Sequence, residues 1–169
     1  RNLRLPAYWQ LTRATHPMTS PVLKPEPLTH EAFLAFGDLI SAENCTDIRS
    51  INEGHTVRFN NLANLALKAN GLVPCLSIFR SRAWLLPRKV HALERHPLTS
   101  QAFIPLGQSP YLIVVAPPGP LLENHIQAFI SQPGQGINYH PGTWHHYNVA
   151  LNEAADFLVV DADGDTPNC

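Results

Sequence analysis

The chain has 169 residues, of which 44% are hydrophobic and 15% are charged, as expected for a globular protein with a substantial core. Its net charge of −1 at pH 7 provides no basic surface for nucleic acid or for an anionic membrane, so we expect neither as a partner. The 16 prolines, which break helices and interior strands, favour many short strands joined by rigid turns.

The charges are distributed unevenly along the chain. All 12 Lys and Arg residues lie within residues 1–95, whereas residues 96–169 contain six acidic residues and no Lys or Arg. A binding site for a small anion must therefore take its permanently cationic side chain from the first half of the chain.

The cysteines and the N-terminus bear on the compartment and on domain organisation. Cys45, Cys75 and Cys169 are far apart and lack metal-binding spacing, which predicts reduced thiols in a cytoplasmic protein. No apolar run reaches the roughly eighteen residues of a transmembrane helix. Residues 1–17 contain three arginines and no acid, and we interpret them as an extension or leader before a single domain at 18–169.

The first part of this domain predicts one short helix between irregular segments. Residues 19–27 contain three prolines and predict an extended entry segment. The segment Leu28–Phe36 has apolar residues at helical spacing, with Thr29 as a candidate N-cap and Gly37 as a stop. Residues 41–56 are rich in turn-forming residues and predict a loop.

From about residue 56 onward, short apolar or alternating runs separated by Pro and Gly predict strands. The predicted strands are Thr56–Phe59, Val73–Arg80, Arg88–His96, Gln101–Leu106, Tyr111–Ala116, Ile126–Ile130, Gly136–His140, Thr143–Ala150 and Phe157–Asp161. This pattern, with one or two short helices, predicts a mainly-β fold of the sandwich or barrel type.

Two segments, His91–Gly107 and Gly134–Asn148, contain five of the nine histidines and are the candidate site. Because side chains alternate along a strand, Glu94 and His96 share one face at the end of the predicted strand Arg88–His96. A carboxylate and an imidazole at the end of an otherwise apolar face suit a site at the mouth of a barrel.

The same alternation sorts the remaining histidines. His145 and His146 must point to opposite faces, so only one of them can share a site with His96. A single histidine beside an aromatic residue is more often structural, and this interpretation is favoured for His91 and His146. Arg95 should point away from the face that carries Glu94 and His96.

The spacing of these residues resembles the two motifs of cupin barrels. One histidine of the first motif is replaced by a glutamate here, and the motif glutamate is replaced by a glutamine. The matching residues are Glu94, His96, Gln101 and Gly107 in the first motif, and Gly142, His145 and Asn148 in the second.

This resemblance implies a ligand set of Glu94, His96, Gln101 and His145 for one divalent metal ion of the nickel, zinc or manganese class, with no organic cofactor. Glutamate and histidine are good ligands for such ions, whereas a neutral glutamine is a weaker one. A loosely held metal and a metal-free site therefore both remain open.

Longer stretches resemble the ureidoglycolate lyase family. They are Leu93–Leu98, Gln101–Pro105, Gly136–His140, Trp144–His146 and Asp156–Asp161, with weaker matches at Ile51–Gly54, Arg58–Ala63, Ser77–Arg80 and Asn168–Cys169. The resemblance covers roughly residues 27–169 and implies a cupin-like β-barrel of the jelly-roll type, often a homodimer. It also implies cleavage of (S)-ureidoglycolate to glyoxylate and urea in allantoin catabolism. Glu53 and Asn60 depart from the family pattern, where Asn and His are expected.

The implied reaction needs a base for the substrate hydroxyl, an acid for the departing nitrogen and a cation for the carboxylate. Histidine titrates near neutrality and suits the first two roles, so His140 and His145 are candidates, together with His96 and Glu94. The candidates for binding the substrate are Arg58 and Arg80 for its carboxylate, and Asn52, Gln101 and Tyr139 for its ureido group.

Two other functions remain open. One is a metal-dependent cupin enzyme of another kind, such as a dioxygenase or an isomerase. The other is a non-catalytic cupin domain that binds or senses a small molecule, which a glutamine at position 101 would favour. A urea assay separates both from the lyase.

Overall fold

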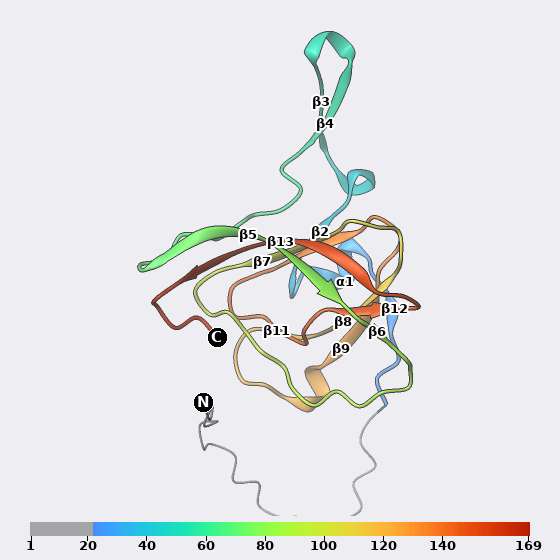
Figure 1. Cartoon of the computed structure of the whole chain (residues 1–169), viewed down its shortest axis with the longest axis vertical. Coiled ribbons are helices and arrows are strands. Elements are labelled where there is room, and N and C mark those ends of the chain that lie inside the picture. Colours follow the sequence, from blue (N-terminus) through green and yellow to red (C-terminus); the bar gives the residue numbers. More distant parts are fainter. Residues whose placement is uncertain (1–21) are drawn as a thin grey trace, which may run out of the picture.

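A computed structural model describes residues 22–169, so the predicted extension at 1–17 lies outside the described residues (Figure 1). Within this range the chain forms two β-sheets and a separate hairpin. The first sheet has the order β1 (Glu26–Pro27), β9 (Gln127–Ile130), β8 (Tyr111–Ala116), β12 (Val149–Leu151) and β6 (Ala83–Trp84), with β11 (Trp144–His145) also paired to β8. The second has the order β2 (Gly37–Ile40), β10 (Gly136–Tyr139), β7 (Gln101–Pro105), β13 (Ala155–Gly164) and β5 (Leu72–Ser81).

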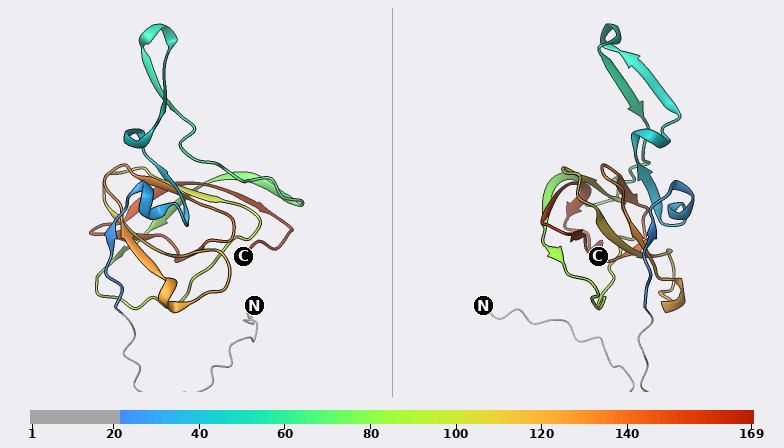
Figure 2. Two further views of the ribbon diagram at one scale, coloured as in Figure 1. Left: turned by 180° about the vertical axis from the view of Figure 1, so that it is seen from behind. Right: turned by 90° about the vertical axis from the view of Figure 1, so that its right-hand side faces the viewer.

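The hairpin pairs β3 (Asp47–Ile51) with β4 (Thr56–Asn60) and projects from the body in every view (Figures 1 and 2). In the part of the chain that the structure describes, helical structure is limited to short pieces. These are α1 (His30–Phe33), η1 (Ala42–Asn44), η2 (Asn52–Gly54) and η3 (Glu123–His125). Within residues 22–169 no helix has the length and apolar character needed to cross a membrane.

The mainly-β class predicted from the sequence is confirmed, whereas the closed barrel is not formed. The pairings leave β1, β6, β2 and β5 at the edges of their sheets within the described residues, so the two sheets form an open, cupin-like sandwich. The main core lies between the sheets, because alternate residues of β8 (Tyr111, Ile113 and Val115) pack with buried residues of the second sheet.

Strand β8 is buried on both faces, which explains its continuous apolar sequence. Leu112 and Val114 point away from the second sheet and pack in a smaller cluster with Val90 and Leu93. The segment that contains Val90 and Leu93 therefore covers the outer face of the first sheet and leads the chain to Glu94.

The short helix α1 forms where the sequence predicts it. The Thr29 side chain accepts a hydrogen bond from the Ala32 N–H at 3.2 Å, as an N-cap does. The helix places Phe33 and Phe36 against Phe129, with ring centroids 5.9 Å apart in each pair. Gly37 does not merely end the helix: it begins β2, so close to the backbone of β10 that a side chain there would clash.

Three element predictions were wrong. Residues 41–56 are not a loop, because this polar segment contains η1 and β3, whose backbone groups pair with β4. The segment Arg88–His96 is not a strand and forms only an isolated bridge between Glu94 and His145. Its apolar side chains pack on the first sheet, but most of its backbone is not paired with a strand. The predicted strand Thr143–Ala150 is two strands, β11 and β12, that pair with different parts of β8.

Candidate active site

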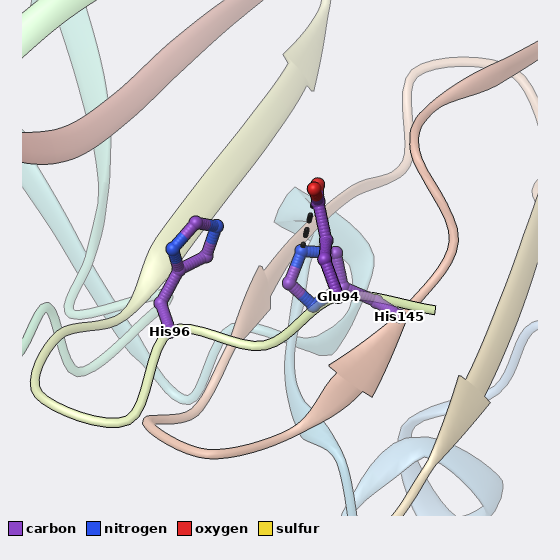
Figure 3. A group of neighbouring side chains, drawn as sticks. All are labelled: Glu94, His96 and His145. Carbon is purple, nitrogen blue, oxygen red and sulfur yellow. Dashed lines mark ion pairs between the residues drawn. The ribbon is translucent and has the colours of Figure 1, made fainter. Parts of the chain in front are cut away.

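Glu94, His96 and His145 lie together, and one ligand atom from each lies within 4.8 Å of the others (Figure 3). The His145 Nε2 is 3.7 Å from Glu94 Oε1, and the two imidazole centroids are 5.3 Å apart. His145 comes from β11, whereas Glu94 and His96 come from the segment that crosses the outer face of the first sheet. We call this group the triad.

The backbone holds these segments in register. The N–H groups of Glu94 and His145 each donate to the carbonyl of the other residue at 2.8 Å. The Gly142 N–H donates to the His96 carbonyl, also at 2.8 Å. The triad is therefore fixed by main-chain hydrogen bonds that do not depend on the functional side chains.

Hydrogen bonds to backbone carbonyls orient both imidazoles in the same way. Nδ1 of His96 is 2.8 Å from the Asn168 carbonyl, and Nδ1 of His145 is 3.0 Å from the Thr143 carbonyl. Because a carbonyl only accepts, each Nδ1 carries the proton, and in the neutral ring Nε2 keeps a free lone pair. Both Nε2 atoms are buried and have no hydrogen-bond partner among the described residues.

His145 is almost completely buried, and its environment favours the neutral form. Burial lowers the pKa of its imidazole from 6.5 to about 4, the hydrogen bond to the Thr143 carbonyl opposes this shift, and the nearby His96 adds to it. Its ring stacks on that of Tyr139 at a centroid distance of 4.3 Å. Burial, and then the charge of Glu94, raises the pKa of Tyr139, so its phenol stays protonated. At neutral pH His145 is therefore available as a base or as a ligand.

A row of polar side chains on the second sheet faces the triad. Gln101 on β7 lies opposite Tyr139 on β10, and its Nε2 donates to Asp161 Oδ2 on β13 at 3.1 Å. On β5, the thiol of Cys75 donates to the other oxygen of Asp161, and this hydrogen bond to the carboxylate raises the pKa of Cys75. With its Nε2 committed to Asp161, Gln101 has a buried Oε1 that has no partner among residues 22–169.

A cavity of about 510 Å³ opens beside the triad. Its lining includes His96, Asp161 and the C-terminal segment with Asp163 and Asp165. The Asn168 side chain anchors that segment, because it accepts from the Leu98 N–H at 2.9 Å and donates to Thr99 Oγ1 at 2.7 Å. The segment therefore both bounds the cavity and orients His96.

The donor atoms fit a divalent metal ion. Two imidazoles with free, buried Nε2 lone pairs and a carboxylate within 4.8 Å form a set that such ions bind, and the backbone carbonyls at each Nδ1 supply the usual outer support. The free Oε1 of Gln101 is a further, weaker donor. Three of the four predicted ligands, Glu94, His96 and His145, thus form a group that is compatible with a metal ion, whereas Gln101 as a fourth ligand stays a prediction.

The structure does not bring the other predicted acid–base residue, His140, to the triad. Its Nε2 is 3.1 Å from Asp38 Oδ1. Asp38 lies in register with Asn138, which faces the opposite side of β10 from Tyr139. Burial raises the pKa of Asp38, but hydrogen bonds from Asn138, from the backbone of Asn64 and from His140 outweigh it, so that the pKa is lowered overall.

The two predicted carboxylate-binding arginines also lie elsewhere within one chain. Arg80 is exposed and forms a bidentate ion pair with Asp156 at 2.8 Å. Arg58 is on β4 and Asn52 is in η2, both in the projecting hairpin rather than in the lining of the cavity. The substrate-binding predictions that the structure brings near the triad are therefore Gln101 and Tyr139.

The predicted directions of the His146 and Arg95 side chains are confirmed. His146 faces away from the triad and meets the Trp84 ring edge-on at 5.0 Å. The Arg95 guanidinium lies 4.5 Å from the centre of the Trp144 ring, which is a cation–π contact and not a site contact.

Sequence reasoning missed Asp161 and Asn168 as parts of the site. Asp161 ends a predicted strand within a stretch that resembles the family, and its polar side chain after apolar Val159 on the same face was a usable signal. For Asn168 the weak match at the end of the chain was the only hint, since a backbone carbonyl that orients a histidine leaves no mark in the sequence.

The fold and site define a cupin-like protein with a histidine- and carboxylate-containing centre beside a cavity. The family model described as ureidoglycolate lyase matches residues 20–169. The chain is 48% identical over 143 residues to a ureidoglycolate lyase of Burkholderia mallei (strain NCTC 10229), covering 85% of this chain and 84% of the relative. It is 47% identical over 145 residues to one of Pseudomonas syringae pv. syringae (strain B728a), covering 85% of each chain. The chain belongs to the ureidoglycolate lyase family.

Proposed function

We propose that this protein is a ureidoglycolate lyase that cleaves (S)-ureidoglycolate to glyoxylate and urea. The observation that carries the proposal is the triad, in which two imidazoles oriented through their Nδ1 atoms and a carboxylate lie beside a cavity that His96 lines, in a member of this family. The same assignment makes the protein part of allantoin degradation. Its free thiols at Cys45, Cys75 and Cys169 suit a cytoplasmic enzyme.

The reaction moves one proton and breaks one bond. Ureidoglycolate has a hydroxyl, a ureido nitrogen and a carboxylate on the same carbon. Removal of the hydroxyl proton lets the C–O bond become the carbonyl of glyoxylate while the C–N bond breaks, and a proton on the departing nitrogen completes urea. No water is consumed, so the site needs only groups that accept and return a proton.

Within the triad, His145 and Glu94 suit these proton transfers. His145 is neutral near pH 7, and its free Nε2 can accept the hydroxyl proton. The carboxylate of Glu94, 3.7 Å from Nε2, stabilises the imidazolium that forms and keeps the proton available for the departing nitrogen. On the other side of the triad, the backbone carbonyl of Asn168 orients the His96 imidazole, which positions the substrate oxygens.

A divalent metal held by Glu94, His96 and His145 would lower the pKa of the substrate hydroxyl. A metal ion and a proton would compete for the same Nε2 lone pair. His145 would therefore be a ligand in the metal-centred version of the site and the base in the metal-free version. In both versions Gln101 accepts a hydrogen bond from the ureido N–H through Oε1, and the Tyr139 ring holds His145 in plane.

The test is incubation of the purified protein with racemic ureidoglycolate, with urea, ammonia and glyoxylate measured separately and metal content determined alongside. The proposal predicts equal amounts of urea and glyoxylate, and half of the racemate consumed. Release of ammonia in place of urea would contradict it. Binding of glyoxylate without turnover would instead indicate the non-catalytic binding domain.

The variant His145→Ala should lose urea release while it keeps a cooperative unfolding transition. His125→Ala is the matched control, because His125 is an exposed histidine in η3. Turnover by His145→Ala at the level of this control would remove His145 from the mechanism.

A further inference from the structure

The projecting hairpin is incomplete as an isolated element. Its strands β3 and β4 pair with each other and with no other strand among the described residues. A two-stranded hairpin without further packing is marginally stable in water. Every view in Figures 1 and 2 shows the hairpin standing clear of the sandwich.

The two faces of the hairpin carry different groups. On one face Ile48, Val57 and Phe59 are exposed, at 57%, 55% and 40% of their surface. On the other face Arg49 and Arg58 lie directly opposite each other, an unfavourable pair of like charges. Arg49 is compensated by a bidentate ion pair with Asp47, whereas Arg58 has no ion pair within residues 22–169. An apolar face and a guanidinium without an ion pair among the described residues both favour binding of a partner.

The cavity of the candidate active site, in contrast, lacks a permanently cationic side chain among the described residues. The described residues that line this cavity include Asp161, Asp163 and Asp165 but no Lys or Arg. These charges would repel a substrate with a carboxylate group, and the lining offers no guanidinium or ammonium group to pair with it. Arg80 is committed to Asp156, and Arg95 to the Trp144 ring.

We propose that the hairpin of a second copy of this chain lies across the mouth of the cavity and supplies Arg58 to the substrate carboxylate. This inference rests on the proposed function for the identity of the anion. A planar guanidinium binds a carboxylate in bidentate fashion, and the aspartates of the lining attract a hairpin that carries two arginines. In a two-fold symmetric dimer the exchange is reciprocal, so each active site combines the triad of one chain with Arg58 of the other.

The body has an uncovered apolar surface that the same association can bury. Leu76 and Ile78 on the edge strand β5 are 67% and 54% exposed. Exposed edge strands with apolar side chains are usually covered by a partner. The second copy is thus the occupant that accounts for the hairpin, the edge strand and the missing cation together.

The test is complementation between two inactive variants. Arg58→Ala should lower kcat/KM for ureidoglycolate about 100-fold, because a charged hydrogen-bonding partner of the substrate is lost. His145→Ala lacks a triad residue. Heterodimers of the two, isolated through two different affinity tags, should recover about half of the wild-type rate, because one of the two sites then receives an intact triad and an intact Arg58.

Heterodimers as inactive as both parents would overturn the proposal, as would Arg58→Ala homodimers with wild-type kcat/KM. Arg82→Ala is the matched control, since Arg82 is an exposed arginine of the body, and its activity should stay within about two-fold of wild type.

A second measurement is independent of catalysis. Sedimentation equilibrium should show a wild-type dimer that the double variant Ile48→Ser, Phe59→Ser weakens at least about ten-fold in dissociation constant. A wild-type monomer would overturn the inference even if urea is released, whereas a dimer that depends on the hairpin but releases no urea would refute only the proposed function.

Discussion

His145 makes the stability of the metal-free protein sensitive to mild acid. The folded protein holds this imidazole in a buried position and lowers its pKa from 6.5 to about 4. The unfolded chain exposes it to water and leaves its pKa near 6.5. As the pH falls below about 6.5, the unfolded state therefore binds a proton that the folded state refuses, and the free energy of unfolding decreases.

The two pKa values set the size and the pH window of the effect. Above about pH 6.5 His145 is neutral in both states and has no influence. Between pH 7.5 and pH 5 the difference in proton binding removes about 2 kcal/mol from the free energy of unfolding, and the full loss of about 3 kcal/mol is reached only below pH 4. A loss of 2 kcal/mol is a large part of the stability of a typical domain.

The assay is denaturation by guanidinium chloride, followed by tryptophan fluorescence, on metal-free protein at a series of pH values. His145→Gln keeps a polar side chain of similar size without a titration, so the pH dependence that wild type shows beyond this variant belongs to His145. Identical pH dependence of the two proteins would refute the argument, because His145 would then titrate equally in the folded and unfolded states.

Three further predictions concern the metal, the C-terminal segment and the core. Chelation should lower urea release and added Ni²⁺, Zn²⁺ or Mn²⁺ should restore it, with metal content measured in parallel; full activity in metal-free protein would leave the acid–base version of the site. Asn168→Ala should lower kcat about ten-fold, because the segment that orients His96 loses its anchors at Leu98 and Thr99, and an unchanged kcat would separate that segment from catalysis. Phe129→Ala should cost about 3–5 kcal/mol of unfolding free energy, since Phe129 is 1% exposed and packs on the aromatic rings beside α1; a loss below about 1 kcal/mol in chemical denaturation would contradict this packing.

The sequence alone determined the features that depend on local chemistry and spacing. Apolar runs such as Tyr111–Ala116 predicted their strands, and Thr29 predicted the start of α1, because burial and capping act on neighbouring residues. The separation of His145 from His146 followed from strand alternation. The motif words around Glu94, His96 and His145 were specific enough to indicate the family.

Only the tertiary structure decided which distant residues meet. The segment with Glu94 lacks ladder partners, yet a single bridge to His145 places its carboxylate beside the imidazole, and no local pattern specifies such a contact. The structure also paired His140 with Asp38 and made the polar residues before Thr56 into a hairpin strand, since their pairing partner lies beyond the turn. Local propensity fixes where a strand begins, whereas long-range packing and backbone pairing decide which side chains share a site.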